Sequence, residues 1–191
     1  MLSELDRSTL LRIAREAVAA AATGKPPPPL DSGSLSPDLL EPRASFVTLT
    51  LPDSELRGCI GGLEAQLPLA LDVQQHAAGA ALDDPRFPPV SPDEAPGLRI
   101  EISVLTAPEL VPHNTPEALL ATLRPGIDGV VLRAGARRAT FLPQVWEKVE
   151  DPVTFLEMLS EKMGATRNAW RFPNVEVLRY QVEMFEESKP A

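Results

Sequence analysis

The stretch ASFVTLTLPDSELRGCIGG, which spans Ala44–Gly62, contains two short apolar segments separated by turn residues. Its first segment, 44–51, alternates aromatic or Thr side chains with Val and Leu, as expected for a strand with one buried face. Pro52-Asp53-Ser54 supplies turn chemistry, so residues 56–60 are expected to pair back as a second strand. The stretch therefore predicts a β-hairpin that ends at Gly61-Gly62.

The second strand of this hairpin carries Cys59, the single cysteine of the chain. In an extended strand, the period of two places Arg57 and Cys59 on one face, about 7 Å apart, while Gly58 faces the other way. A fixed cation near a thiol favours the thiolate, which is the nucleophilic form. Gly58 and Gly61 leave room for a ligand or for another backbone. A second interpretation stays open, because free cysteines are often packed and inert.

A proline-rich corner, residues 83–90, follows the next predicted helix. Asp84 and Arg86 in this corner have two interpretations. As a structural unit, they form an ion pair that locks the turn. As a functional unit, Arg86 joins Arg57 to bind a carboxylate or a phosphate beside Cys59. A hard cation bound by Asp83 and Asp84 is a further alternative.

Two other side chains are candidates for proton transfer. His76 flanks the apolar stripe of the helix that begins at Pro68, where it is either the base that activates Cys59 or an ordinary histidine on a helix face. Glu101 lies in the predicted strand 98–104, on the face opposite to the apolar side chains. The candidate catalytic residues are therefore Cys59, His76 and Glu101.

The remaining pattern predicts helices and strands in irregular alternation. Helices are expected at 4–22, 68–82, 116–123 and 152–163, and strands at 44–51, 56–60, 98–104, 129–133, 138–142 and 176–184. The acidic tail, 183–188, is expected to be solvated. Hairpins with helices between them favour an α+β fold with a mainly antiparallel sheet over a doubly wound fold. The chain is expected to be one domain over residues 1–191, with a Pro/Ser-rich wrapping loop at 25–43, for which a proline-rich ligand of a recognition domain is the alternative.

The composition of the chain argues against several classes of function. The formal net charge is −9, which argues against broad basic patches for nucleic acid or acidic membranes. A single cysteine permits no disulfide within the chain, which suits a reducing cytosol. One cysteine and two histidines also provide few ligands for a metal, so no metal and no cofactor is predicted. Charged residues at 12, 15 and 16 interrupt the first apolar run, so no membrane span and a cytoplasmic location are expected. Phosphate-binding loops, dinucleotide fingerprints and serine-hydrolase elbows are absent from the sequence.

Several motifs resemble one known family. They are Leu56-Arg57-Gly58-Cys59-Ile60-Gly61, Phe46-Val47-Thr48-Leu49, Asp84-Pro85-Arg86-Phe87, Glu101-Ile102-Ser103-Val104-Leu105, Leu142-Pro143-Gln144-Val145 and the pattern of Lys162, Gly164 and Trp170. These motifs occur in the expected order and span about Leu10–Phe185. Through them the chain resembles the AMMECR family (Alport syndrome, midface hypoplasia and elliptocytosis chromosomal region). It departs from the family pattern in its extra prolines and at Trp146-Glu147-Lys148.

The resemblance implies two lobes of an α+β fold, with the cysteine motif beside a cleft. It also implies association with a Memo-like protein and a radical S-adenosylmethionine enzyme. The first hypothesis is an enzyme or enzyme subunit that binds a small anionic substrate through Arg57, Gly58, Gly61, Asp84 and Arg86. A non-catalytic interaction scaffold is the second hypothesis. An accessory factor in nucleic-acid modification is the third, although the acidic charge disfavours nucleic acid as a direct partner.

Overall fold

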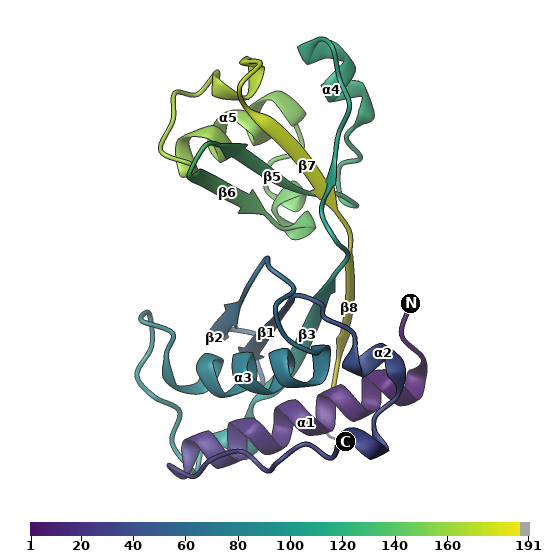
Figure 1. The fold of residues 1–191 in the computed structure, drawn as a ribbon. Coiled ribbons are helices and arrows are strands. Elements are labelled where there is room, and N and C mark those ends of the chain that lie inside the picture. The colour runs from purple at the N-terminus through teal and green to yellow at the C-terminus, as the bar shows by residue number, and fades with distance from the viewer. Residues whose placement is uncertain (188–191) are drawn as a thin grey trace. The chain divides into compact units, whose positions relative to one another are not determined.

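The computed structural model describes residues 1–187, and their contacts divide the chain into two compact units. The first unit comprises Met1–Leu105 together with the chain from Glu183 onward, and the second is Thr106–Val182. Helices and antiparallel strand pairs occur in both units, as expected for an α+β fold (Figure 1). The cleft between lobes that the family resemblance implies stays a prediction.

The first unit is a four-stranded sheet with helices packed on it. Its strand order is β2-β1-β3-β8, with β1 (Ser45–Thr50), β2 (Leu56–Gly61), β3 (Arg99–Leu105) and β8 (Val182–Glu186). Its helices are α1 (Glu4–Ala22), α2 (Pro37–Leu40) and α3 (Leu69–Leu82), with 3-10 turns η1 (Ser32–Ser34) and η2 (Ala95–Gly97). β1 pairs antiparallel with both β2 and β3, so the predicted hairpin is confirmed and β2 is an edge strand.

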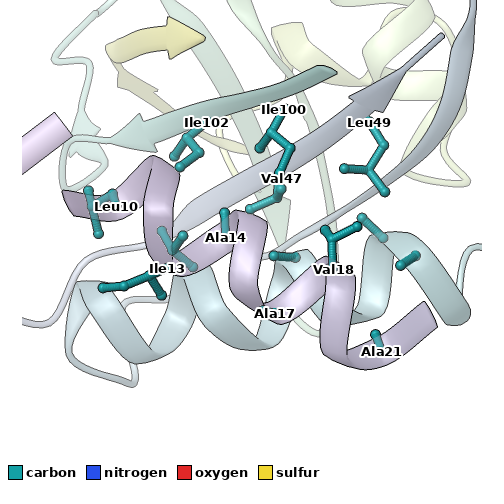
Figure 2. Packing of buried hydrophobic residues seen from close by; sticks show 14 of the residues in the cluster. Leu10, Ile13, Ala14, Ala17, Val18, Ala21, Val47, Leu49, Ile100 and Ile102 are labelled. Carbon is teal, nitrogen blue, oxygen red and sulfur yellow. The ribbon is translucent and has the colours of Figure 1, made fainter. Parts of the chain in front are cut away.

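Helix α1 forms where the sequence pattern places it. The Ser3 side chain accepts from the backbone N–H of Asp6, and the Asp6 carboxylate accepts from the Ser3 backbone, which is a capping box. Its buried stripe packs against α3 and reaches β3, and Figure 2 shows Ala14 and Val18 on the side of α1 that faces Val47 of the sheet. Burial of this stripe, rather than helix propensity alone, stabilises the helix.

Residues 25–43 contain more structure than a simple loop. Besides η1 and α2, the segment places Leu30 and Leu35 against the core and buries Leu39 completely. The Gln74 side chain donates to the Pro28 carbonyl oxygen at 2.9 Å. The proline run is therefore attached to α3, in agreement with a wrapping role within the first unit.

The second unit is also a four-stranded sheet, with the order β4-β7-β5-β6. Its strands are β4 (Glu109–Leu110), β5 (Gly129–Ala134), β6 (Arg137–Phe141) and β7 (Glu176–Tyr180). Its helices are α4 (Pro116–Thr122) and α5 (Pro152–Lys162), with 3-10 turns η3 (Pro143–Glu147) and η4 (Ala169–Arg171). The core beneath this sheet is aromatic, with Trp146 stacked on Phe155 at a centroid distance of 3.6 Å. Thr115 and Asp151 cap the two helices, as the sequence predicts.

The prediction of one final strand over 176–184 is wrong. The alternation continues through this segment, but β7 ends at Tyr180 and β8 begins at Val182, and the two halves belong to different sheets. The Gln181 N–H bonds the Thr106 hydroxyl at 2.9 Å, and its carbonyl oxygen accepts from the Thr106 N–H. Hydrophobic alternation cannot reveal which sheet each half joins, because it describes the two faces of a strand and not its pairing partners.

The acidic tail is not simply solvated either. Glu183 accepts from Arg7 at 2.7 Å and from the backbone N–H of Leu2. Glu187 pairs with Arg15 and accepts from the Ile100 N–H at 3.1 Å. Opposite charges from α1 therefore bind this segment, while Ser188 lies outside the described residues. These long-range pairs join positions more than 170 residues apart, which a sequence pattern does not show.

Candidate functional site

The strand β2 contains an irregularity at Arg57. Cys59 pairs with Thr48 and Gly58 with Leu49, but the next partner of Thr50 is Leu56, so Arg57 is the extra residue of a bulge. A bulge changes the direction of side chains on an edge strand. The simple alternation that placed Arg57 beside Cys59 therefore does not hold at this position.

The environment of Cys59 combines partial exposure with two hydrogen bonds. The Thr48 hydroxyl donates to the Cys59 sulfur at 3.4 Å. The Cys59 backbone N–H, at the edge of the sheet, donates to Asp84 Oδ2 at 2.8 Å. Cys59 itself is half-buried. Its backbone is therefore held in place, while its side chain is neither sealed in the core nor fully in water.

Asp84 and Arg86 form a two-point ion pair. Arg86 donates through Nε and Nη2 to the two oxygens of Asp84, at 2.9 and 2.7 Å. This contact, joined by the Cys59 N–H, holds the pKa of Asp84 far below its ordinary value although burial opposes the shift. The same contact raises the pKa of Arg86, with a smaller contribution from the charge of Cys59. The geometry matches the turn-locking interpretation of this corner.

Arg57 is also paired. Its Nη2 lies 3.0 Å from Oε2 of Glu94, and this contact lowers the pKa of Glu94. Both guanidinium groups lie over the Phe87 ring, at 5.8 Å for Arg57 and 5.5 Å for Arg86. The side chain of Arg57 is only 10% exposed, whereas that of Arg86 is 55% exposed. Of the two arginines expected to bind an anion, Arg86 is therefore the one that a ligand can reach.

The glycines of the motif have packing roles. A Cβ placed at Gly58 would overlap the carbonyl oxygen of Ala80 in α3, and one at Gly61 would overlap Phe46. Gly58 therefore faces the helix, and Cys59, as its neighbour in the strand, faces the other side of the sheet. Of the two alternatives for Gly58 and Gly61, these contacts match the close approach of another part of the protein and not that of a ligand.

His76 does not reach Cys59. Its Nδ1 lies 3.1 Å from Asp72 Oδ2 and 3.4 Å from the Ser45 hydroxyl, on the side of the sheet that α3 covers. The expected pair of Cys59 and His76 is therefore not formed, because the two side chains project from opposite faces. A helical position alone cannot fix which face of a neighbouring sheet a side chain meets.

Glu101 does share the face of Cys59. Thr48 pairs with Cys59 on one side and with Glu101 on the other, so the three residues lie in one row across β2, β1 and β3. Strands are about 4.8 Å apart, which puts the backbones of Cys59 and Glu101 about 10 Å from each other. Burial, followed by the charge of Glu186, raises the pKa of Glu101. Glu101 therefore lies on the same face as Cys59, with Thr48 between it and the thiol, and its role in proton transfer stays a prediction.

Comparisons with known proteins agree with this fold over almost the whole chain. The family model described as AMMECR1 matches residues 11–185. The chain belongs to the AMMECR1 family. A protein from Thermofilum pendens is 39% identical over 201 residues, which cover 99% of this chain and 93% of that relative. Protein MJ0810 from Methanocaldococcus jannaschii is 39% identical over 156 residues, 78% of this chain and 76% of its own length.

A solved crystal structure supports the same assignment. The uncharacterized protein PH0010 from Pyrococcus horikoshii is 34% identical in sequence and matches with a TM-score of 0.86. The match covers 99% of this chain and 95% of that one. The resemblance found in the sequence motifs is therefore confirmed at the level of family and fold.

Three residues to which the sequence analysis gave no role at the site contribute to it in this AMMECR1-family protein. Thr48 could be found from the hairpin register, because it is the cross-strand partner of Cys59. Phe87 follows Arg86 directly in the chain, whereas its contact with Arg57 and the pairing of Arg57 with Glu94, 37 positions away, have no local pattern. Among residues 1–187, no group of three or more His, Cys, Asp or Glu side chains is arranged for a metal. Within the same range, no helix is both long and apolar enough to cross a bilayer.

Proposed function

We propose that this AMMECR1-family protein is an enzyme or enzyme subunit that handles a small anionic substrate at Cys59. The thiol acts as nucleophile or redox group, and the exposed guanidinium of Arg86 attracts the anion. Arg57, Asp84, Gly58 and Gly61 position this region of β2 rather than contact the substrate. The cytoplasmic location stays a prediction, as do the Memo-like and radical S-adenosylmethionine partners.

The observation that carries the proposal is the set of contacts around one half-buried sulfur. The Thr48 hydroxyl donates to this sulfur. The Arg86 guanidinium binds the same carboxylate as the Cys59 N–H, so a positive charge lies beside the thiol. The Asp84 carboxylate fixes the Cys59 backbone and holds Arg86 beside it. Glu101, on the same face, supplies a carboxyl group for proton exchange.

Alkylation tests the proposal cleanly because the chain has one cysteine. Rates of Cys59 modification by neutral iodoacetamide and anionic iodoacetate are measured at one near-neutral pH. We expect the ratio of the iodoacetate rate to the iodoacetamide rate to be higher for Cys59 than for free cysteine. Arg86→Gln should reduce that preference by about threefold to tenfold, because it removes the positive charge beside the thiol.

Arg12→Gln serves as the matched control, because Arg12 is an exposed arginine of α1 in the same unit and pairs with Glu16. It should leave both rates unchanged. A native Cys59 that reacts with neither reagent would exclude a role as nucleophile. A reagent preference that survives Arg86→Gln would exclude Arg86 as the anion-attracting group.

A scaffold is the second candidate, and one observation favours it. Gly58, Gly61, Arg57 and Asp84 all make contacts within the protein, as a rigid surface for a partner requires. If the protein is a scaffold, a pull-down should show that the Cys59→Ser variant still binds the partner and that the Arg57→Ala variant does not. Circular dichroism of Arg57→Ala is needed beside it, since Arg57 is almost fully buried and its loss leaves Glu94 without its partner.

A further inference from the structure

A groove in the second unit is separate from the Cys59 region. It lies between residues 110–116 and residues 170–177, and its volume is about 620 Å³. All of its lining residues belong to Thr106–Val182. Its volume falls within the usual range for sites that bind small molecules.

The walls of this groove display apolar surface. Leu110 and Phe172 line it on opposite segments and are 56% and 44% exposed. Pro112 and Pro173 extend the two walls. Large apolar side chains that stay exposed around a concavity are typical of a ligand site. The groove therefore favours a ligand with an apolar or aromatic body.

The charge of the groove selects among such ligands. The Arg171 guanidinium lies over the Trp170 ring at 4.3 Å, and it has no carboxylate partner among residues 1–187. Stacking uses the face of the guanidinium and leaves its N–H edge available. Glu176 is the carboxylate of the lining, and Arg133 already binds it at 2.6 Å. The unpaired charge in the wall is therefore positive.

A spare donor lies next to this cation. The indole N–H of Trp170 is buried and has no hydrogen-bond partner within the described part of the chain. A buried donor without a partner is uncommon in folded proteins and is costly. Arg171 stacks on the ring that carries this donor, so the cation and the N–H without a partner belong to the same wall.

We infer that the groove binds a small monocarboxylate with an apolar or aromatic body. The N–H edge of the Arg171 guanidinium matches a carboxylate, which accepts two parallel hydrogen bonds. A phosphate is disfavoured because the wall offers one cation and not the cluster that phosphate sites use. This inference stands on the second unit alone and does not depend on the chemistry of Cys59.

Three probes with the same body and different charge test the inference. They are 4-phenylbutyrate, its neutral amide 4-phenylbutanamide and the cation 4-phenylbutylamine. Binding is followed by calorimetry and by tryptophan fluorescence, because both tryptophans lie in the core of this unit but only Trp170 also lines the groove. We expect the carboxylate to bind at least about tenfold more tightly than the amide, and the amine more weakly than the amide.

Variants assign this preference to residues. Arg171→Gln should bring the affinity for the carboxylate down to that for the amide. Leu110→Ser should weaken the binding of all three probes and keep their order. Arg167→Gln is the matched control, since Arg167 is an exposed arginine of the same unit that pairs with Glu157 outside the groove. Equal affinity for the three probes, or no binding of the carboxylate up to its solubility limit, would overturn the inference.

Discussion

In the first unit, α3 lies so close to β2 that Gly58 has no room for a side chain, whereas in the second unit Gly129 faces the ring of Tyr180. The core of the first unit is rich in small side chains. Eight of them are buried alanines: Ala14, Ala17, Ala21, Ala70, Ala77, Ala80, Ala81 and Ala95. The core of the second unit contains Trp146, Phe155 and Trp170. Backbone atoms therefore meet closely in one unit, and rings fill the space in the other.

This difference determines how each unit tolerates change. A helix carbonyl cannot move without shifting the helix, whereas a ring relieves a contact by a change of side-chain angle. The Cys59 region depends on the less tolerant kind of contact. The position of Cys59 is therefore set by the close packing of β2 on α3. The ion pairs of Arg57 and Arg86 also hold this edge strand in place.

The largest expected effect comes from Gly58→Ala. The added methyl group would overlap the Ala80 carbonyl oxygen, and we expect a loss of roughly 3 kcal/mol or more in the free energy of unfolding. Urea unfolding followed by circular dichroism measures it. Gly97→Ala is the matched control because a Cβ there meets nothing within 4 Å. Gly129→Ala should cost less than Gly58→Ala, and the reverse order would break the comparison between the two units.

A smaller effect is expected from Asp84→Asn. The substitution removes the charge that binds Arg86 and the Cys59 N–H, at a cost of about 2 kcal/mol near neutral pH. Because the pKa of Asp84 is lowered by folding, its contribution to stability is complete above about pH 4 and is lost as the pH falls toward the folded-state pKa. The stability of the wild type should therefore fall in acid more steeply than that of Asp84→Asn. Parallel acid unfolding curves would contradict this role.

The smallest expected effect is the titration of Tyr180. Burial raises the pKa of Tyr180 to about 12, although its hydrogen bond with Thr140 opposes the shift. Stability from this group is complete below the ordinary tyrosine pKa of about 10 and is lost as the pH rises through 12. Tyr180 is the single tyrosine, so tyrosinate absorbance follows it directly. The denatured chain should titrate near 10, and a native titration at the same pH would show that the ring is not sealed.

Local patterns account for most elements of the fold. The capping box of Ser3 and Asp6, the alternation of 44–51 and the caps at Thr115 and Asp151 each act within a few residues, and each produces the predicted element. The motif around Cys59 also gave the correct family. The continuous alternation of 176–184 failed as a guide because it runs through Gln181 without a break, whereas the strands on either side of Gln181 belong to different sheets.

The sequence by itself determined the hairpin, the helices and the family, because hydrophobic period, turn chemistry and helix caps are interactions between near neighbours. Only the tertiary structure decided that His76 and Cys59 face opposite sides of the sheet, that Glu94 neutralises Arg57, and that a groove carries the unpaired Arg171. The physical reason is distance along the chain. Contacts between elements depend on strand register and on the face each element buries, and both are fixed only when the whole core packs.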